Sequence, residues 1–305
     1  RKHFAPIEPS LAEMTEKAIE LLSPNPQGFF LMIEASQVDW AGHANDPVYM
    51  VTDFLAFDEA VGKALDFAKK DRETLVIGFA DHNTGALSIG QQQGPGAPDY
   101  TETSLEDMLD PIRDATITVQ GLLSMIPPSP SWHDIKDTFV NYWGDWWNKM
   151  TEDQAQQIIA LDGDSYAIAE YLSNEFTIFG WTTHGHSGED VPLWSYGKVR
   201  PVGHFDNTEL AQMMARAFGI NLDFMTQRLF IDATNLPGYA LDDKTDPENP
   251  VVKIGDNVEI PISKDLVIKN GETYNMVGIT VHAPEIDKVF IPFQALRCIQ
   301  WGVCR

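Results

Sequence analysis

The chain has 305 residues, of which 43% are hydrophobic and 22% are charged, an ordinary composition for a globular protein with room for one large domain and an appendage. Its 45 acidic and 21 basic residues give a net charge of -24, which argues against nucleic acid or an anionic membrane surface as a partner. The sequence contains no apolar run of about 18 residues, the length that a transmembrane helix needs.

The first predicted element is a helix that begins after Ser10, because Ser10 and Glu13 have the spacing of a capping box. A turn rich in proline and glycine follows. Residues 29–34 (FFLMIE) then form a short apolar run that ends at Glu34. A run of this kind, bounded by turn signals, predicts a strand that is buried on both faces.

Two candidate metal ligands come directly after this predicted strand. Asp39 and His43 are four residues apart, so one turn of helix would place both side chains on the same face. Carboxylate oxygen and imidazole nitrogen are ligands that zinc takes in proteins. The position of the pair, just past a strand end, is where open α/β sheets bind their ligands.

A second pair repeats this arrangement. Asp46 and Pro47 predict the start of a helix that reaches about residue 70. The next apolar run, residues 75–80, ends in Asp81 and His82. Strand, site, helix, strand, site is the order of a βαβ unit, which predicts two ligand clusters at one edge of a parallel sheet.

Residues 91–102 read as a loop that leaves the sheet, and the sequence is then helical to about residue 179. Helix starts are predicted at Ser131 and Thr151. Asp164 and the serine after it also read as a helix start, and not as a nucleophile. An aromatic stripe at helical spacing is expected to pack this helical segment onto the main domain rather than to form a substrate-contacting lid; it comprises Phe139, Tyr142, Trp143, Trp146 and Trp147.

Residues 181–190 (WTTHGHSGED) are expected to lie beside the two predicted ligand pairs, because they carry two further histidines, His184 and His186. The nearby glycines suggest that this segment is a loop. Residues 191–196 predict another strand of the sheet. A closing helix is expected over residues 207–218 and ends at Gly219.

The character of the sequence then changes to short β-branched runs, at residues 224–234, 251–262, 265–269, 273–282 and 287–293. Asn270 and Gly271 predict a type I′ hairpin turn. Residues 242–250 read as a linker between this β-rich module and the preceding part of the chain. Cys298 and Cys304 are compatible either with a small disulfide loop or with two free thiols.

Three segments carry a resemblance to a known family. They are FLMIEASQVDWAGHAND, LVIGFADHNTGAL and THGHSGEDVPLWSYG, and they resemble the metal-site segments of the alkaline phosphatases. This resemblance implies a doubly wound α/β fold with a mostly parallel sheet. The expected organisation is the C-terminal half of that domain in residues 1–90 and 181–219, a helical insertion in residues 91–180, and a β-rich module in residues 220–305.

The same resemblance implies a ligand set. Carried over by position, Asp39, His43 and His186 would hold one zinc ion, and Asp81 and His82 would hold a second. Two zinc ions would neutralise charge on a phosphoryl group that a protein of this net charge otherwise repels.

Further features follow from the family. Glu34 would contribute to a magnesium site, and His184 matches no family ligand and is expected to lie beside the ligands. The implied reaction is the hydrolysis of phosphate monoesters through a phosphoserine. The family's nucleophile lies in an upstream Asp-Ser-Ala segment, so we expect the N-terminal half of the enzyme as a second fragment and little activity from this chain alone.

Two other functions stay open at this point. The same metal site could act on diesters, phosphonates or sulfate esters. Alternatively, the chain could be a non-catalytic, secreted metal-binding or adhesive protein whose β-rich module makes the contact. The family resemblance also implies a periplasmic or extracellular location and allows a homodimer.

Overall fold

The computed structural model describes residues 8–90, 101–102 and 104–304. The chain divides into two compact units, Arg1–Val202 (unit 1) and Gly203–Arg305 (unit 2). The predicted loop over residues 91–102 lies almost wholly outside the described residues.

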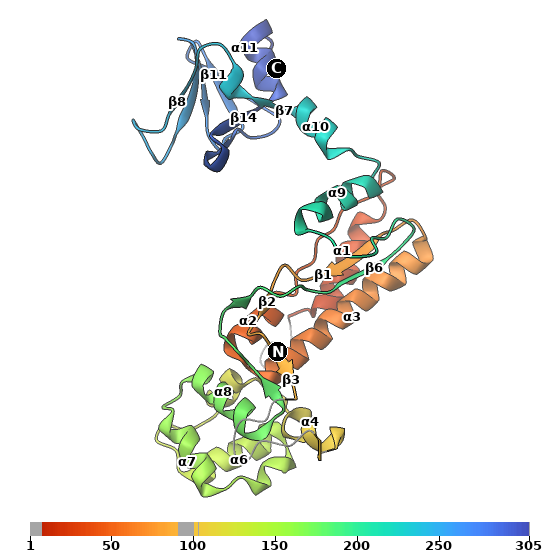
Figure 1. The fold of residues 1–305 in the computed structure, drawn as a ribbon, viewed down its shortest axis with the longest axis vertical. Coiled ribbons are helices and arrows are strands. Elements are labelled where there is room, and N and C mark those ends of the chain that lie inside the picture. The colour runs from red at the N-terminus through yellow and green to blue at the C-terminus, as the bar shows by residue number, and fades with distance from the viewer. Residues whose placement is uncertain (1–7, 91–100, 103, 305) are drawn as a thin grey trace. The chain divides into compact units, whose positions relative to one another are not determined.

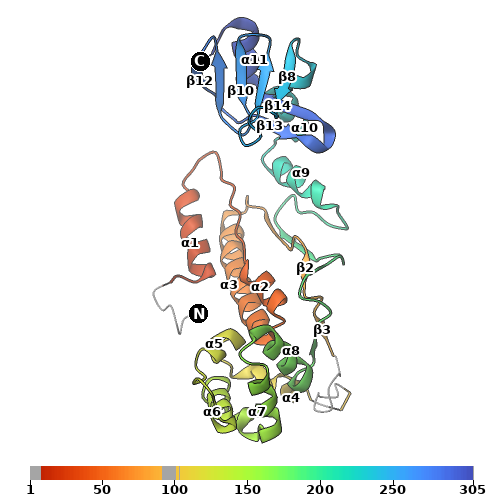
Figure 2. The same cartoon turned by 90° about the vertical axis from the view of Figure 1, so that its left-hand side faces the viewer.

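Two helices lie side by side in unit 1, α1 (Leu11–Leu22) and the long α3 (Pro47–Asp71) (Figures 1 and 2). The capping box predicted at the start of α1 is confirmed, since the Ser10 side chain accepts a bond from the Glu13 amide and Glu13 accepts one from the Ser10 amide. The start of α3 is also confirmed, because Asp46 caps the helix by accepting bonds from two amides of its first turn.

A two-stranded antiparallel ribbon joins β1 (Val76–Phe79) to β6 (Leu193–Tyr196). Both strands lie within apolar runs that predicted them. Every strand pair in the described part of the chain is antiparallel, so the mostly parallel sheet expected from the sequence is not confirmed.

The prediction of a strand over residues 29–34 is wrong for this structure, because none of these residues lies in a strand. The segment runs beside α3, where the ring centroids of Phe29 and Phe67 are 5.9 Å apart. Much of its apolar surface is exposed, with Phe30 60% and Met32 70% exposed. An apolar run becomes a strand only when another strand pairs with it, and no described strand lies against this one.

Two shorter ribbons bring distant segments together. β2 (Asn83–Thr84) pairs with β5 (His186–Ser187), and β3 (Ser88–Ile89) pairs with β4 (Phe179–Gly180). Through these pairings, the segment after β1 lies directly against the histidine-containing segment that follows the helical part of unit 1.

The helical part of unit 1 is a bundle of short helices (Figure 1). They are α4 (Leu105–Arg113), α5 (Val119–Leu123), α6 (Trp132–Trp143), the 3-10 helix η1 (Asp145–Lys149), α7 (Glu152–Ala160) and α8 (Ser165–Phe176). The helix starts predicted at Ser131 and Thr151 are confirmed as capping boxes. Asp164 caps α8, so its serine neighbour is part of a helix start, as predicted.

The aromatic stripe forms the core of this bundle. Phe139, Trp143 and Trp147 are at most 1% exposed. The indole N–H groups of the two tryptophans donate to the carbonyls of Ile117 and Pro111 at 2.8 and 2.9 Å, so burial leaves neither donor unpaired. The stripe packs the helices of the bundle against one another, whereas the sequence predicted that it packs the helical segment onto the main domain. Truncating either indole to alanine would cost about 3–5 kcal/mol.

Unit 2 contains a five-stranded antiparallel sheet in the order β12-β11-β10-β9-β8 and a three-stranded sheet in the order β13-β14-β7 (Figure 2). The strands are β7 (Phe230–Asp232), β8 (Tyr239–Asp242), β9 (Val251–Ile254), β10 (Val258–Pro261), β11 (Leu266–Lys269), β12 (Glu272–Asn275), β13 (Val281–Ala283) and β14 (Lys288–Pro292). The helices are α9 (Asn207–Ala217), α10 (Leu222–Leu229) and α11 (Phe293–Trp301), with short 3-10 turns η2 (Ala233–Asn235) and η3 (Pro284–Ile286).

The sequence predicted part of this pattern correctly. Asn270 and Gly271 have φ angles of 54° and 81°, the positive values that a type I′ turn between β11 and β12 requires. Residues 242–250 are not a linker between modules, because β8 and β9 pair with each other and the segment is a loop within the sheet. Residues 222–229 are helical and not a strand, because the Asn221 side chain caps α10 by accepting a bond from the Phe224 amide.

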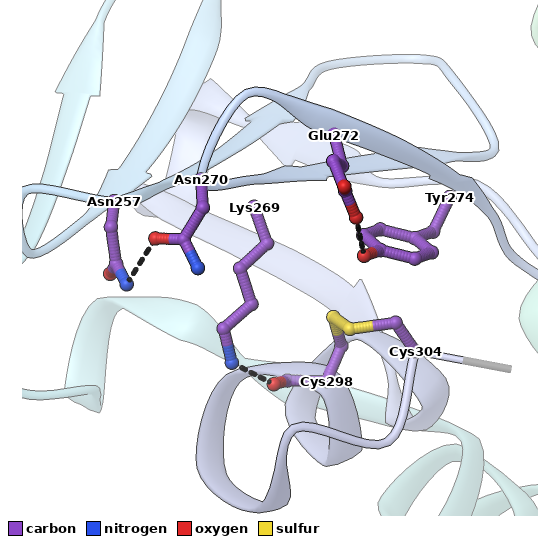
Figure 3. Close-up of a disulfide and its surroundings, with 7 residues drawn as sticks. All are labelled: Asn257, Lys269, Asn270, Glu272, Tyr274, Cys298 and Cys304. Atoms are coloured by element: carbon purple, nitrogen blue, oxygen red, sulfur yellow. Dashed lines mark hydrogen bonds between the residues drawn. A yellow bond between two sulfur atoms is a disulfide. The ribbon is translucent and has the colours of Figure 1, made fainter.

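The two cysteines form a disulfide, which decides between the two readings of the sequence (Figure 3). The Cys298 side chain is fully buried, and its carbonyl accepts a 2.6 Å bond from the Lys269 ammonium. The disulfide ties the last part of α11 to the segment that follows it. No helix in the described part of the chain is both long and apolar enough to cross a membrane.

Candidate metal centre

The site is built first on the short helix α2 (Gln37–Ala44). Asp39 lies in its first turn and His43 in its last turn. Because they are four residues apart, both side chains lie on one face, with His43 Nε2 3.5 Å from Asp39 Oδ2. Both side chains are about one-third exposed, so they can be reached from solvent.

The β2–β5 ribbon carries a third group to this face. Thr84 and His186 are register partners in the ribbon, and His186 Nε2 lies 3.7 Å from Asp39 Oδ1. One ligand atom from each of Asp39, His43 and His186 lies within 4.8 Å of the other two. The structure therefore brings together three of the six ligands expected from the sequence.

The chemistry and spacing of this donor set fit a zinc-class ion. A tetrahedral site with bonds of about 2.0–2.1 Å has ligand atoms about 3.4 Å apart. His43 Nε2 is 3.5 Å from Asp39 Oδ2 and His186 Nε2 is 3.7 Å from Asp39 Oδ1, so each imidazole is about this far from one oxygen of the carboxylate. His43 Nδ1 lies 2.5 Å from the His184 carbonyl oxygen. A carbonyl only accepts, so His43 Nδ1 carries the proton and the lone pair of Nε2 is free to coordinate.

Asp81 and His82 lie beside this group. They follow β1, and the His82 ring stacks on the His186 ring with a centroid distance of 3.6 Å and an angle of 21°. Asp81 Oδ2 is 3.2 Å from His82 Nε2. This carboxylate and imidazole therefore lie next to the first set, with His82 in contact with His186; their role as ligands of a second ion stays a prediction.

Glu34 is the ligand expected at a magnesium site. It is exposed, on the segment that precedes α2, and it does not belong to the group formed by Asp39, His43 and His186. Its assignment to a magnesium site stays a prediction.

Thr84 is a residue of the site that the sequence analysis missed. Its hydroxyl donates a 2.6 Å bond to Asp39 Oδ1 and lies 3.2 Å from His82 Nδ1. Thr84 is 5% exposed, so it lies beneath the two donor pairs and contacts one member of each. The signal in the sequence was its place two residues after His82.

Gly42 allows α2 and β2 to approach this closely. A Cβ atom at Gly42 would lie 2.7 Å from the Thr84 carbonyl oxygen and 2.9 Å from Thr84 Cβ, distances that a side chain cannot occupy. The bond between Thr84 and Asp39 therefore depends on a glycine within α2.

Comparison with known proteins places this arrangement in context. The sequence model of the alkaline phosphatase family matches residues 3–220. Alkaline phosphatase 3 of Bacillus subtilis (strain 168) is 36% identical over 223 residues, which are 70% of this chain and 45% of that protein. The repressible alkaline phosphatase of Saccharomyces cerevisiae is 28% identical over 253 residues, covering 72% of this chain and 42% of that protein.

Solved structures give the same picture. A cold-active alkaline phosphatase from a psychrophilic Shewanella species superposes with a TM-score of 0.56 at 26% identity, over 68% of this chain and 50% of that one. The Thermus thermophilus alkaline phosphatase superposes with a TM-score of 0.57 at 23% identity, over 70% and 48%, a likeness of fold. The chain spans less than half the length of the curated relatives described above.

Proposed function

This chain belongs to the alkaline phosphatase family, and on that basis we propose that its metal centre takes part in the hydrolysis of phosphate monoesters. The observation that carries the proposal is the convergence of Asp39, His43 and His186 to within 4.8 Å from segments far apart in the sequence. A carboxylate with two imidazoles is a donor set of catalytic zinc sites, which leave a coordination position open for substrate.

The proposed cofactors are two zinc ions and one magnesium ion. Asp39, His43 and His186 would hold one zinc ion, and Asp81 and His82 would contribute to the second. Glu34 would contribute to the magnesium site. When bound, the zinc ions supply Lewis-acid stabilisation of the negative charge on the phosphoryl group. The net charge of -24 repels phosphate esters, so the proposed function requires a local positive centre.

The residues of this chain position the donors. The Thr84 hydroxyl donates a hydrogen bond to Asp39 Oδ1. This bond restricts rotation of the carboxylate and so holds it in place. The His43 Nδ1–H bond to a backbone carbonyl presents Nε2 toward Asp39 and His186. Outer contacts of this kind orient metal ligands and raise their affinity for the ion.

We further propose that the nucleophile is a serine supplied by a part of the enzyme outside these 305 residues, and that the reaction passes through a phosphoserine. The exposed apolar side chains of Phe30 and Met32 support a missing neighbour, because a soluble protein rarely leaves such a run uncovered. A strand from that other part would pair with residues 29–34 and cover them.

In this proposal, residues 1–90 and 181–219 form the C-terminal half of the catalytic domain, residues 91–180 are an insertion, and residues 220–305 are a separate β-rich module. The disulfide between Cys298 and Cys304 supports a periplasmic or extracellular location, because such bonds persist in oxidising compartments.

The test has two steps. The 305-residue chain, loaded with zinc and magnesium, is assayed with p-nitrophenyl phosphate and with bis(p-nitrophenyl) phosphate. We expect metal binding without enzymatic turnover. Denaturing mass spectrometry of any active preparation should then find either a second polypeptide or a longer chain that contains these 305 residues. Native mass spectrometry of the same sample reports whether two copies assemble.

Each alternative has its own outcome. Full activity in a sample that contains only this chain would overturn the proposal of an external serine. Faster turnover of the diester than of the monoester would favour a phosphodiesterase. Failure to bind any metal would overturn the metal centre itself and leave the non-catalytic function.

A further inference from the structure

His184 joins the two backbone segments that carry metal ligands. His184 Nδ1 lies 2.9 Å from the His43 carbonyl oxygen, and His43 Nδ1 lies 2.5 Å from the His184 carbonyl oxygen. Both carbonyls can only accept, so each ring nitrogen is the donor. The two bonds form a reciprocal clamp between residues that are 141 positions apart.

The other side of the His184 ring contacts the helical bundle. His184 Nε2 lies 3.8 Å from Glu170 Oε2, and the ring stacks on Tyr166 with a centroid distance of 5.5 Å and an angle of 15°. Tyr166 and Glu170 are four residues apart on α8, so both side chains lie on one face of that helix. α8 thus holds the imidazole from the side opposite to its bond with His43.

α8 also contacts the end of α2 directly. The Ser173 hydroxyl donates to the carbonyl of Asn45, the residue that ends α2, at 3.3 Å. Because Tyr166, Glu170 and Ser173 all lie on α8, this helix is fixed against both segments of the site.

We propose that His184 is a positioning residue of the metal centre, and that through it α8 holds the ligands His43 and His186 in place. His186 lies two residues after His184 in the segment that the clamp fixes, and His43 is the clamp's other partner. The inference rests on the proposed function, because it assumes that these histidines bind metal.

The clamp has a direct consequence for coordination. Without the bond from His184 Nδ1, one of the two bonds that hold residue 43 against residue 184 is lost. The bond from His43 Nδ1 to the His184 carbonyl then loses its geometry, and the orientation of the His43 ring is no longer set. Loss of an outer contact of this kind lowers metal affinity by about 10–100-fold.

The test measures Co²⁺ binding to the 305-residue chain by titration and by the visible d–d spectrum, without any substrate. His184→Ala should bind Co²⁺ about tenfold or more weakly and should change the spectrum. His184→Asn should recover most of the affinity, because the asparagine amide nitrogen occupies roughly the place of Nδ1. The double variant Tyr166→Ala/Glu170→Gln removes the ring that stacks on His184 and the charge of Glu170; the expected loss of Co²⁺ affinity is about tenfold, the lower end of the range for outer contacts.

His133→Ala is the matched control, because His133 is an exposed histidine on α6, where its ring contacts Trp132. Circular dichroism of the metal-free proteins reports folding. If His184→Ala fails to fold, the inference is tested by the Co²⁺ affinities of His184→Asn and of the α8 double variant, each compared with that of the control.

The outcomes are distinct. Wild-type affinity in His184→Ala would overturn the inference while leaving the metal centre intact. A loss that asparagine does not repair would reduce His184 to a packing role and also overturn it. Unchanged affinity in the α8 double variant would overturn the part played by α8. If the wild-type chain binds no metal, it is the proposed function that fails.

Discussion

The hydroxyl of Thr84 donates a 2.6 Å hydrogen bond to the carboxylate of Asp39, across 45 positions of sequence. The same oxygen lies 3.2 Å from His82 Nδ1, so one buried side chain touches a member of each donor pair. The two pairs therefore share an outer contact, and a change at Thr84 should affect both.

Thr84→Val should weaken zinc binding by about 10–100-fold, because valine has the shape of threonine but leaves Asp39 Oδ1 without its donor. Thr84→Ser keeps a hydroxyl and should retain affinity near that of the wild type. Competition titration with a zinc-sensitive dye measures both variants. Thr52→Val serves as control, since the Thr52 hydroxyl bonds only to carbonyls within α3. Equal affinity in Thr84→Val and wild type would contradict this prediction.

His43→Ala or His186→Ala should remove one zinc equivalent while preserving the fold, because each is one of about three protein ligands at an open site. Elemental analysis of dialysed protein measures the metal, and circular dichroism measures the fold. His282→Ala, a change in β13 of unit 2, should keep full metal content. Unchanged zinc in both site variants would show that the ion is held elsewhere.

Asp46 should make the stability of the protein depend on pH. Burial raises the pKa of Asp46 to about 6, against the lowering effect of hydrogen bonds from the amides of Tyr49, Val119 and Val48. A carboxyl with a raised pKa in the folded state contributes stability that is fully present below its unfolded value, 3.8, and that is lost as the pH rises toward 6. The change is about 3 kcal/mol.

The free energy of unfolding in urea is measured for the wild type and for Asp46→Asn at several pH values between about 4 and 7. The difference between the two proteins isolates the effect of Asp46. The stability of the wild type relative to the variant should fall with rising pH and level off above about pH 6. A constant offset is expected in addition, because asparagine cannot accept the bond from the Val119 amide to Asp46 Oδ2. A pH-independent difference between the two proteins would contradict the raised pKa.

Removal of the disulfide should loosen the end of α11. The bond closes a loop with a sequence separation of 6, for which chain entropy predicts about 2 kcal/mol of stabilisation. Cys304→Ala breaks the bond and leaves the buried Cys298 sulfur in the core. Hydrogen exchange by mass spectrometry should show lost protection over residues 293–304. Dithiothreitol should reproduce the effect in the wild type and have none in the variant.

Local signals in the sequence were sufficient for the helix starts and for one hairpin. Ser10, Asp46 and Asp164 cap helices with their own side chains, an interaction that spans only a few residues and is therefore readable from spacing. Asn270 and Gly271 form the predicted turn for the same reason, since their φ angles are a local property. Asp39 and His43 share a face of α2 because four residues make about one helical turn.

The sequence could not decide features that depend on a distant partner. Residues 29–34 have the composition of a buried strand, but a strand exists only where another one pairs with it. The segment at residues 242–250 has the composition of a linker, and only the pairing of β8 with β9 makes it a loop within a sheet. In the same way, one reading of the cysteines was selected by the fold around Cys298.

The same distinction between local features and distant contacts applies to the candidate site. By itself, the sequence determined which residues have the chemistry of metal ligands, because carboxylates and imidazoles at short spacing, as in Asp39 and His43, are recognisable without coordinates. Only the tertiary structure decided which of them meet, and which side chains hold them. Thr84 and His184 act through contacts 45 and 141 positions away, and such contacts leave no periodicity in the sequence because they arise from the path of the backbone through β2 and β5.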